Sequence, residues 1–105
     1  MAAGGGTTAV DFSVTAGSDQ TTGDGALVKN FENLDASALA TALTVTGSTA
    51  GNVITTGSGA DTIDGNGGGD TIVAGAGNDS VAYWGTETSI DGGADNNTLV
   101  MRATG

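Results

Sequence analysis

Apolar residues in the second half of the chain recur singly, at a spacing of nine residues. Each is an aliphatic residue whose neighbours are mostly polar or small, and the series consists of Ile54, Ile63, Ile72, Val81, Ile90 and Leu99. Such alternation predicts a very short strand whose middle side chain points inward while its neighbours point outward. Six residues rich in Gly, Asp, Asn and Thr precede each strand, and these types favour turns. The pattern predicts six nonapeptides between Gly47 and Val100.

Two nonapeptides, or 18 residues, are expected to form one coil with two short strands and two Gly-rich turns. Successive coils then stack about 4.8 Å apart, as strands do in any sheet. The predicted fold class is all-β: a right-handed parallel β-roll, which is a β-solenoid. Turns on one edge come from alternate repeats, so that one edge carries Asp61, Asp79 and Asn97 and the other carries Asn52, Asp70 and Thr88.

Glycine and aspartate occupy fixed places in the three central repeats. The segments TGSGADTID, GNGGGDTIV and AGAGNDSVA begin at Thr56, Gly65 and Ala74, and each has Gly in fourth place, Asp in sixth and a β-branched residue in eighth. Gly permits the positive φ angles that tight turns need. The frame weakens on both sides, where Asn52 and Thr88 stand in sixth place.

This pattern resembles GGxGxDxUx, the signature of the repeats-in-toxin (RTX) family of calcium-binding β-rolls. The resemblance implies that two like-facing turns hold a calcium ion between them through aspartate carboxylates and loop carbonyls. It also implies a larger bacterial protein that a type I secretion system exports unfolded and that folds outside the cell, where calcium is millimolar. We therefore expect an extracellular protein.

The candidate calcium ligands are the sixth-place side chains and the turn glycines, because calcium prefers carboxylate and carbonyl oxygens. We expect the strongest site between the turns that end at Asp61 and Asp79. The next is expected between Asp79 and Asn97, with Asp95 close by. The full set of candidate ligands is Asn52, Gly57, Gly59, Asp61, Gly68, Asp70, Gly75, Gly77, Asp79, Asp95 and Asn97.

A weaker calcium site is expected where Asn52 faces Asp70, because Ala50 replaces the fourth-place Gly in the first of these turns. No site is expected between Asp70 and Thr88. The prediction is therefore one to three calcium ions. Tyr83 and Trp84 interrupt the turn before Thr88, and we expect them to form a local apolar cap, with a binding patch as the alternative.

Charge and composition agree with a divalent cation as partner. The 105 residues include 12 acidic and only two basic residues, for a net charge of −10, which argues against binding to nucleic acid or to anionic membranes. No apolar run is long enough to insert in a membrane. The chain has no His and no Cys, which excludes zinc hydrolysis, His-based triads and thiol catalysis. We do not expect an enzyme.

The apolar series is too small to order the Gly-rich repeats between Gly47 and Val100. Ordering a Gly-rich chain costs more conformational entropy than six buried aliphatic side chains offset, and rows of carboxylates add repulsion. Composition alone is therefore also compatible with disorder. A site that exists only in the folded chain converts binding energy into folding energy, so the repeats are expected to fold only in calcium.

The first half of the chain carries no regular nonapeptide. Residues 1–6 lack an export signal and are expected to be a flexible start of a fragment from a longer protein. Residues 7–46 are expected to form capping rungs of the solenoid, whose calcium-binding part spans residues 47–105. The only two phenylalanines, Phe12 and Phe31, are expected to plug the open core.

Alternation predicts strands over Val10–Val14 and Leu43–Thr46 in these rungs. Gly17–Gly25 reads as a loop. Asp35–Ala42 is expected to form one helical turn with Asp35 as its N-cap.

Three functions remain open from the sequence. The first is a calcium-triggered folding and stabilising module of a secreted protein. The second is a self-associating surface-layer or matrix tile, because open solenoid ends carry unpaired strands that stack end to end. The third is an ice-binding solenoid. It needs a regular outward file of Thr, which Val73, Asp64 and Asp91 interrupt.

Overall fold

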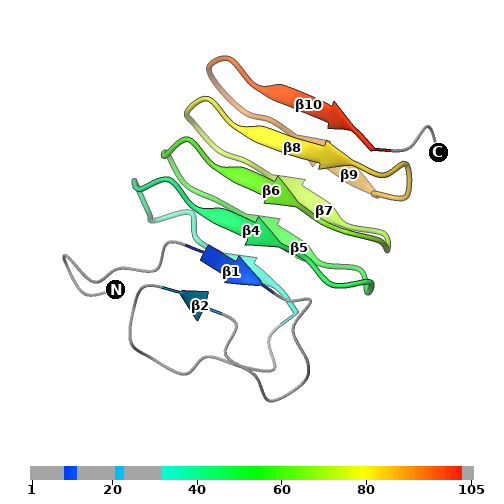
Figure 1. Cartoon of the computed structure of the whole chain (residues 1–105). Helices are drawn as coiled ribbons and strands as arrows, with labels where there is room; N and C mark the ends of the chain where they lie inside the picture. Colours follow the sequence, from blue (N-terminus) through cyan, green and yellow to red (C-terminus); the bar gives the residue numbers. More distant parts are fainter. Residues whose placement is uncertain (1–8, 12–20, 23–31, 103–105) are drawn as a thin grey trace.

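The fold is a stack of flattened coils, in which short strands joined by turns are the only regular secondary structure of the described residues (Figure 1). The computed structural model describes residues 9–11, 21–22 and 32–102. None of these residues lies in a helix, and hence none lies in a helix able to cross a membrane. The ten strands are β1 (Ala9–Asp11), β2 (Thr21–Thr22), β3 (Leu34–Asp35), β4 (Thr44–Thr46), β5 (Val53–Thr55), β6 (Thr62–Asp64), β7 (Thr71–Val73), β8 (Ser80–Tyr83), β9 (Ser89–Asp91) and β10 (Thr98–Met101).

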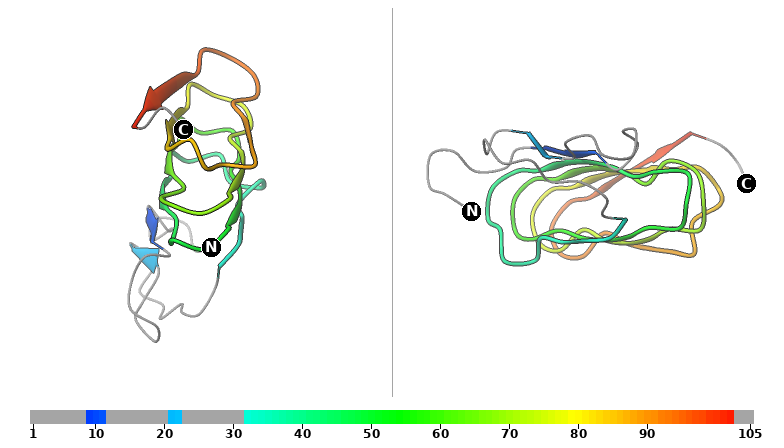
Figure 2. Two further views of the ribbon diagram at one scale, coloured as in Figure 1. Left: turned by 90° about the vertical axis from the view of Figure 1, so that its right-hand side faces the viewer. Right: turned by 90° about the horizontal axis from the view of Figure 1, so that it is seen from below.

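Two sheets face each other across the solenoid (Figure 2). One has the strand order β10-β8-β6-β4-β1-β2 and the other the order β3-β5-β7-β9. From β4 onward, neighbouring strands are parallel and their paired residues are 18 positions apart, as in Ile63 with Val81 and Ile54 with Ile72. The predicted 18-residue coil and the parallel β-roll are confirmed.

The middle residue of each central strand points into the space between the sheets. Ile54, Ile63, Ile72 and Val81 are almost fully buried and belong to one apolar cluster that Val45 joins from β4. Apolar burial therefore takes the form of two facing ladders of aliphatic side chains. Val53 begins β5 and faces outward with 49 % of its surface exposed.

The N-terminal strands extend the same sheets, with two departures from prediction. β1 lies parallel to β4, while β2 lies antiparallel to β1, so the expected loop over Gly17–Gly25 contains a strand. The rest of that loop, residues 12–14 of the predicted first strand, residues 1–6 and both phenylalanines lie outside the described residues.

The helical turn predicted over Asp35–Ala42 is wrong. Asp35 ends β3, and its carboxylate accepts hydrogen bonds from the backbone N–H and the hydroxyl of Ser37, at 3.1 and 2.7 Å. A helix N-cap accepts the same bond, but here a single turn follows, in which Leu39 N–H donates to the carbonyl of Ala36 at 3.0 Å, and no described residue is helical. The hydrogen bonds from Ser37 lower the pKa of Asp35. The segment is an edge turn of the solenoid, in which Ala36 N–H bonds to the carbonyl of Thr55.

Candidate metal centre

Sixth-place Asp and Asn side chains connect neighbouring turns as a ladder along the edges of the solenoid, whereas Thr88 bonds to the carbonyl of Asp70 only through its backbone N–H. In each step, Oδ1 of a side chain accepts a hydrogen bond from a backbone N–H that lies 18 residues earlier. The steps are Leu43 to Asp61 (2.9 Å), Asn52 to Asp70 (2.8 Å), Asp61 to Asp79 (2.8 Å) and Asp79 to Asn97 (3.0 Å). One oxygen of each side chain therefore clamps neighbouring turns together without any ion.

The second carboxylate oxygen of the three aspartates has no partner. Asp61, Asp70 and Asp79 are between 0 and 2 % exposed, and Oδ2 of each is buried without accepting a hydrogen bond. A buried polar atom without a partner is costly, and a buried charge more so. A cation bound beside each Oδ2 removes that cost. These three atoms therefore fit the calcium ions that the repeat pattern implies.

Burial disfavours the charged form of two of these carboxylates, those of Asp70 and Asp79. It raises the pKa of Asp70 to about 6, against the opposing hydrogen bond from the Asn52 N–H, with further contributions from the charges of Glu87 and Asp64. It also raises the pKa of Asp79, to which the charges of Asp61 and Asp95 contribute. Ionised aspartates in these turns therefore gain from a nearby positive charge.

Turns on the same edge stack backbone against backbone. A Cβ atom on Gly75 or Gly77 would overlap the carbonyl oxygen of Gly57 or Gly59, respectively, in the preceding turn. Gly75 and Gly77 also have positive φ, at 75° and 101°, whereas neither Gly57 nor Gly59 is among the described residues with positive φ. The two turns of the predicted strongest site therefore have different backbone conformations.

The turn that ends at Asn97 uses its side chains differently. Asp95 stands in the fourth place with φ of 70°, and its Oδ2 accepts a hydrogen bond from Gly77 N–H at 2.9 Å. The Asn97 amide donates to the carbonyls of Gly93 and Ala94 in its own turn. The structure thus brings Asp95 across to the preceding turn, next to the pair formed by Asp79 and Asn97.

On the opposite edge, Asn52 satisfies its polar atoms within the protein. It is 1 % exposed, its amide donates to the carbonyl of Glu32 at 2.7 Å and to the hydroxyl of Ser48, and its Oδ1 accepts from Ser48 N–H. Gly68, in the facing turn, has φ of 92° and lies against the carbonyl of Ala50. In this pair only Asp70 has an oxygen without a partner.

The irregular turn after β8 is closed by a carboxylate that the sequence analysis did not single out. Glu87 accepts hydrogen bonds from the backbone N–H groups of Trp84, Gly85 and Thr86, at 2.8, 3.0 and 3.1 Å. The Trp84 indole donates to Asp64 at 2.7 Å. The turn therefore holds itself with side chains where the regular turns have buried carboxylates. The only sign of this turn in the sequence is a single Glu within the broken repeat.

Aspartates in the ninth place have a local role. Asp64 accepts a hydrogen bond from Asn66 N–H, and Asp91 accepts one from Gly93 N–H, both at 2.9 Å and two residues ahead. This is the aspartate turn that starts a loop. Position in the repeat thus separates turn-forming aspartates from the buried sixth-place ones.

Comparison with protein families identifies the repeats. A family model for the RTX calcium-binding nonapeptide repeat matches residues 46–81, in four copies. Residues 46–81 are RTX calcium-binding repeats. The match includes Asn52, Asp61, Asp70 and Asp79. Beyond it, the 18-residue register of the paired strands continues through β10. No curated protein and no solved structure matches the chain.

RTX repeats in general bind calcium as structural elements. Within the described ranges, no three acidic side chains gather closely enough to hold a metal by themselves. A calcium ion at these turns would therefore also need oxygens from backbone carbonyls, which the hard calcium ion accepts.

Proposed function

We propose that the chain is a calcium-dependent folding module of a secreted protein, unfolded at low calcium and ordered by the extracellular ion. The supporting observation is the set of three buried Oδ2 atoms without partners, on Asp61, Asp70 and Asp79. In the absence of a cation they oppose folding. When calcium binds between the turns, the same atoms become ligands, and binding energy becomes folding energy.

We assign one to three ions to this module. The first lies between the turns that end at Asp61 and Asp79, with Gly57, Gly59, Gly75 and Gly77 supplying the close-packed backbone. The second lies between Asp79 and Asn97 and uses Asp95. The weakest lies between Asn52 and Asp70, beside Gly68, where the Asn amide is already engaged within the protein.

The proposed setting is a longer bacterial polypeptide exported by a type I system. Support comes from the RTX repeats and from the expected dependence of folding on calcium. A chain that stays unfolded at submicromolar calcium inside the cell can pass through an export channel. Outside the cell, millimolar calcium exceeds the dissociation constants of about 10⁻⁴–10⁻³ M that extracellular calcium modules commonly show.

Circular dichroism in EDTA and in millimolar calcium tests this function. We expect a mostly disordered spectrum in EDTA and a β spectrum after calcium is added, with a sigmoidal titration. Magnesium is the control, because it demands a smaller octahedral shell and should not substitute at equal concentration. The same β spectrum and the same thermal midpoint in EDTA and in calcium would show that the ion is not needed.

A self-associating tile is the second candidate. The observation in its favour is the C-terminal end of the solenoid, where Leu99 and Met101 are 51 and 56 % exposed. Such a tile requires the same calcium-loaded solenoid as its unit.

A further inference from the structure

The turn before β7 contains a glycine that its backbone does not require. Of the asparagines in the chain, only Asn66 is followed by glycine, and this Gly67 stands in the third place of its repeat, where the neighbouring repeats have Ser58 and Ala76. Gly67 is not among the described residues with positive φ, and a Cβ atom built on it would have nothing within 4 Å. The turn would therefore accept another small residue at this position.

An asparagine followed by glycine can modify itself. The Gly67 nitrogen attacks Cγ of Asn66, the new N–C bond closes a succinimide ring, and the side-chain nitrogen leaves as ammonia with the proton that the Gly67 nitrogen gives up. Water then opens the ring at one of its two carbonyls, which leaves aspartate or isoaspartate at position 66. Glycine favours ring closure because it has no Cβ to crowd the attacking nitrogen. Within the described ranges, no group accepts a hydrogen bond from the Gly67 N–H.

The folded solenoid holds the Asn66 side chain away from Gly67. Asn66 has φ of 63°, its N–H donates to Asp64 at 2.9 Å, and its amide donates to the carbonyl of Gly47 in the preceding coil at 3.2 Å. The amide thus reaches across to the neighbouring turn. Ring closure instead needs its carbon next to the Gly67 nitrogen, so the bond to Gly47 must break first. The reaction is therefore free to proceed only when this turn is open.

We propose that Asn66–Gly67 is a self-deamidation site, reactive in the calcium-free chain and protected in the calcium-bound solenoid. The reaction needs no enzyme and no reactant other than water. The proposal rests on the calcium-dependent folding proposed above, because the fold that protects the site is the one that calcium stabilises. It implies that the module can remain without calcium for only a limited time before it loses the ability to fold.

The deamidated product does not fit the stacked turns. The amide that donates to the Gly47 carbonyl becomes a carboxylate, which has no hydrogen to donate and adds charge to a chain of −10. Isoaspartate also lengthens the backbone by a carbon atom. On either side of Asn66, the carbonyl of Gly65 lies against Gly47, and Gly68 lies against the carbonyl of Ala50. A longer backbone between these two contacts displaces at least one of them.

Ageing the chain in EDTA and in millimolar calcium tests the site, with released ammonia as the readout. Ammonia reports asparagine alone, because an Asp–Gly pair such as Asp64–Gly65 forms the same ring with loss of water. We expect release in EDTA to be at least about tenfold faster than in calcium, since a turn that costs about 1.4 kcal/mol to open is open about a tenth of the time. Peptide mapping by mass spectrometry should place the product at position 66.

Gly67→Ala is the matched control, because open space surrounds this position and the variant should fold at the same calcium concentration. It retains every Asp–Gly pair, yet ammonia release in EDTA should slow severalfold. Aged samples then receive calcium and are followed by circular dichroism. The wild-type chain should lose its recoverable β signal in step with ammonia release, whereas Gly67→Ala should recover it.

Equal ammonia release from the wild-type chain and Gly67→Ala in EDTA would overturn the proposal. So would equal release in EDTA and in calcium from a chain whose β spectrum requires calcium, or full recovery of that spectrum after deamidation. A β spectrum of the fresh chain in EDTA would instead refute calcium-dependent folding. Ageing the wild-type chain and Gly67→Ala in urea would then still decide whether Asn66–Gly67 is the reactive pair.

Discussion

Asp79→Asn should move the metal-free and the calcium-bound protein in opposite directions. Asp79 is 2 % exposed, its Oδ1 accepts the Asp61 N–H, and its Oδ2 has no partner. Asn97 shows what an Asn does at the equivalent place one coil later. Its Oδ1 keeps the same ladder bond, and its amide donates to two carbonyls of its own turn. The substitution therefore closes the turn without an ion.

In the metal-free protein, the change removes a buried charge that lacks a partner and adds a donor that finds one. We expect the free energy of unfolding in EDTA to rise by about 1–3 kcal/mol, the cost of such an unsatisfied group. In calcium, the change replaces a carboxylate ligand by a neutral oxygen in both sites that share Asp79. A loss of about 1.4–2.8 kcal/mol of binding energy raises the calcium midpoint by about 10- to 100-fold.

The assay is circular dichroism: the amount of β structure in EDTA reports the change in the metal-free protein, and a calcium titration gives the midpoint of folding. Asp91→Asn is the matched control. It removes one negative charge from an exposed aspartate and retains an oxygen for the Gly93 N–H, so the calcium midpoint should change less than about twofold, as surface substitutions usually do. Equal calcium midpoints for the two variants would refute the assignment of Asp79 as a ligand.

Three further outcomes follow from the same geometry. Gly75→Ala should destabilise the calcium-loaded fold by more than about 1 kcal/mol in urea unfolding, because of positive φ and overlap with the preceding turn, while Gly67→Ala, in open space, should have little effect. The pKa of Asp70 is about 6 in the folded chain, against 3.8 for an unperturbed Asp. This difference stabilises the metal-free fold below pH 4 by about 3 kcal/mol relative to high pH, and the contribution is lost as the pH rises through 6. The amount of structure in EDTA, followed by circular dichroism, should therefore increase on acidification. Trp84→Phe removes the bond to Asp64 and should lower the free energy of unfolding by about 1 kcal/mol, with unchanged calcium stoichiometry in a chelator competition titration.

The solenoid was predictable because both the aliphatic residues and the Gly and Asp residues repeat with the same nine-residue period. The nine-residue spacing of Ile63, Ile72 and Val81 fixes the strands, and the Gly and Asp places fix the turns between them. Both signals agree in the three central repeats, so the 18-residue register of the paired strands followed directly. The sixth-place aspartates are likewise stacked along the predicted edges.

The misplaced features depend on contacts that no local pattern encodes. Asp35 is as compatible with a helix N-cap as with the turn it forms, and pairing of β3 with β5 determines the outcome. β2 has no apolar alternation and exists through its pairing with β1.

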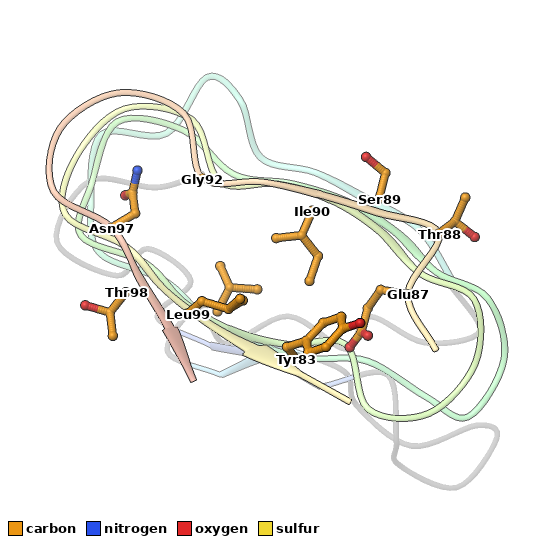
Figure 3. A pocket seen from close by; sticks show the side chains of 10 residues that line it. Tyr83, Glu87, Thr88, Ser89, Ile90, Gly92, Asn97, Thr98 and Leu99 are labelled. Atoms are coloured by element: carbon orange, nitrogen blue, oxygen red, sulfur yellow. The ribbon is translucent and has the colours of Figure 1, made fainter. Parts of the chain in front are cut away.

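The Glu87 turn could not be predicted for a related reason. Its three bonds require a backbone that presents three N–H groups to one carboxylate, and the sequence shows only a broken repeat. The same break led us to expect an apolar cap from Tyr83 and Trp84. Tyr83 lines a pocket between β8, β9 and β10 (Figure 3), whereas Trp84 donates a hydrogen bond to Asp64.

The central claim is that the buried Oδ2 atoms are calcium ligands, and crystals grown in calcium test it most directly through anomalous scattering. We predict anomalous peaks between like-facing turns, with at least one peak about 2.3–2.6 Å from Oδ2 of Asp61 or Asp79. A well-ordered solenoid in the same crystals with no peak near these atoms would contradict the account.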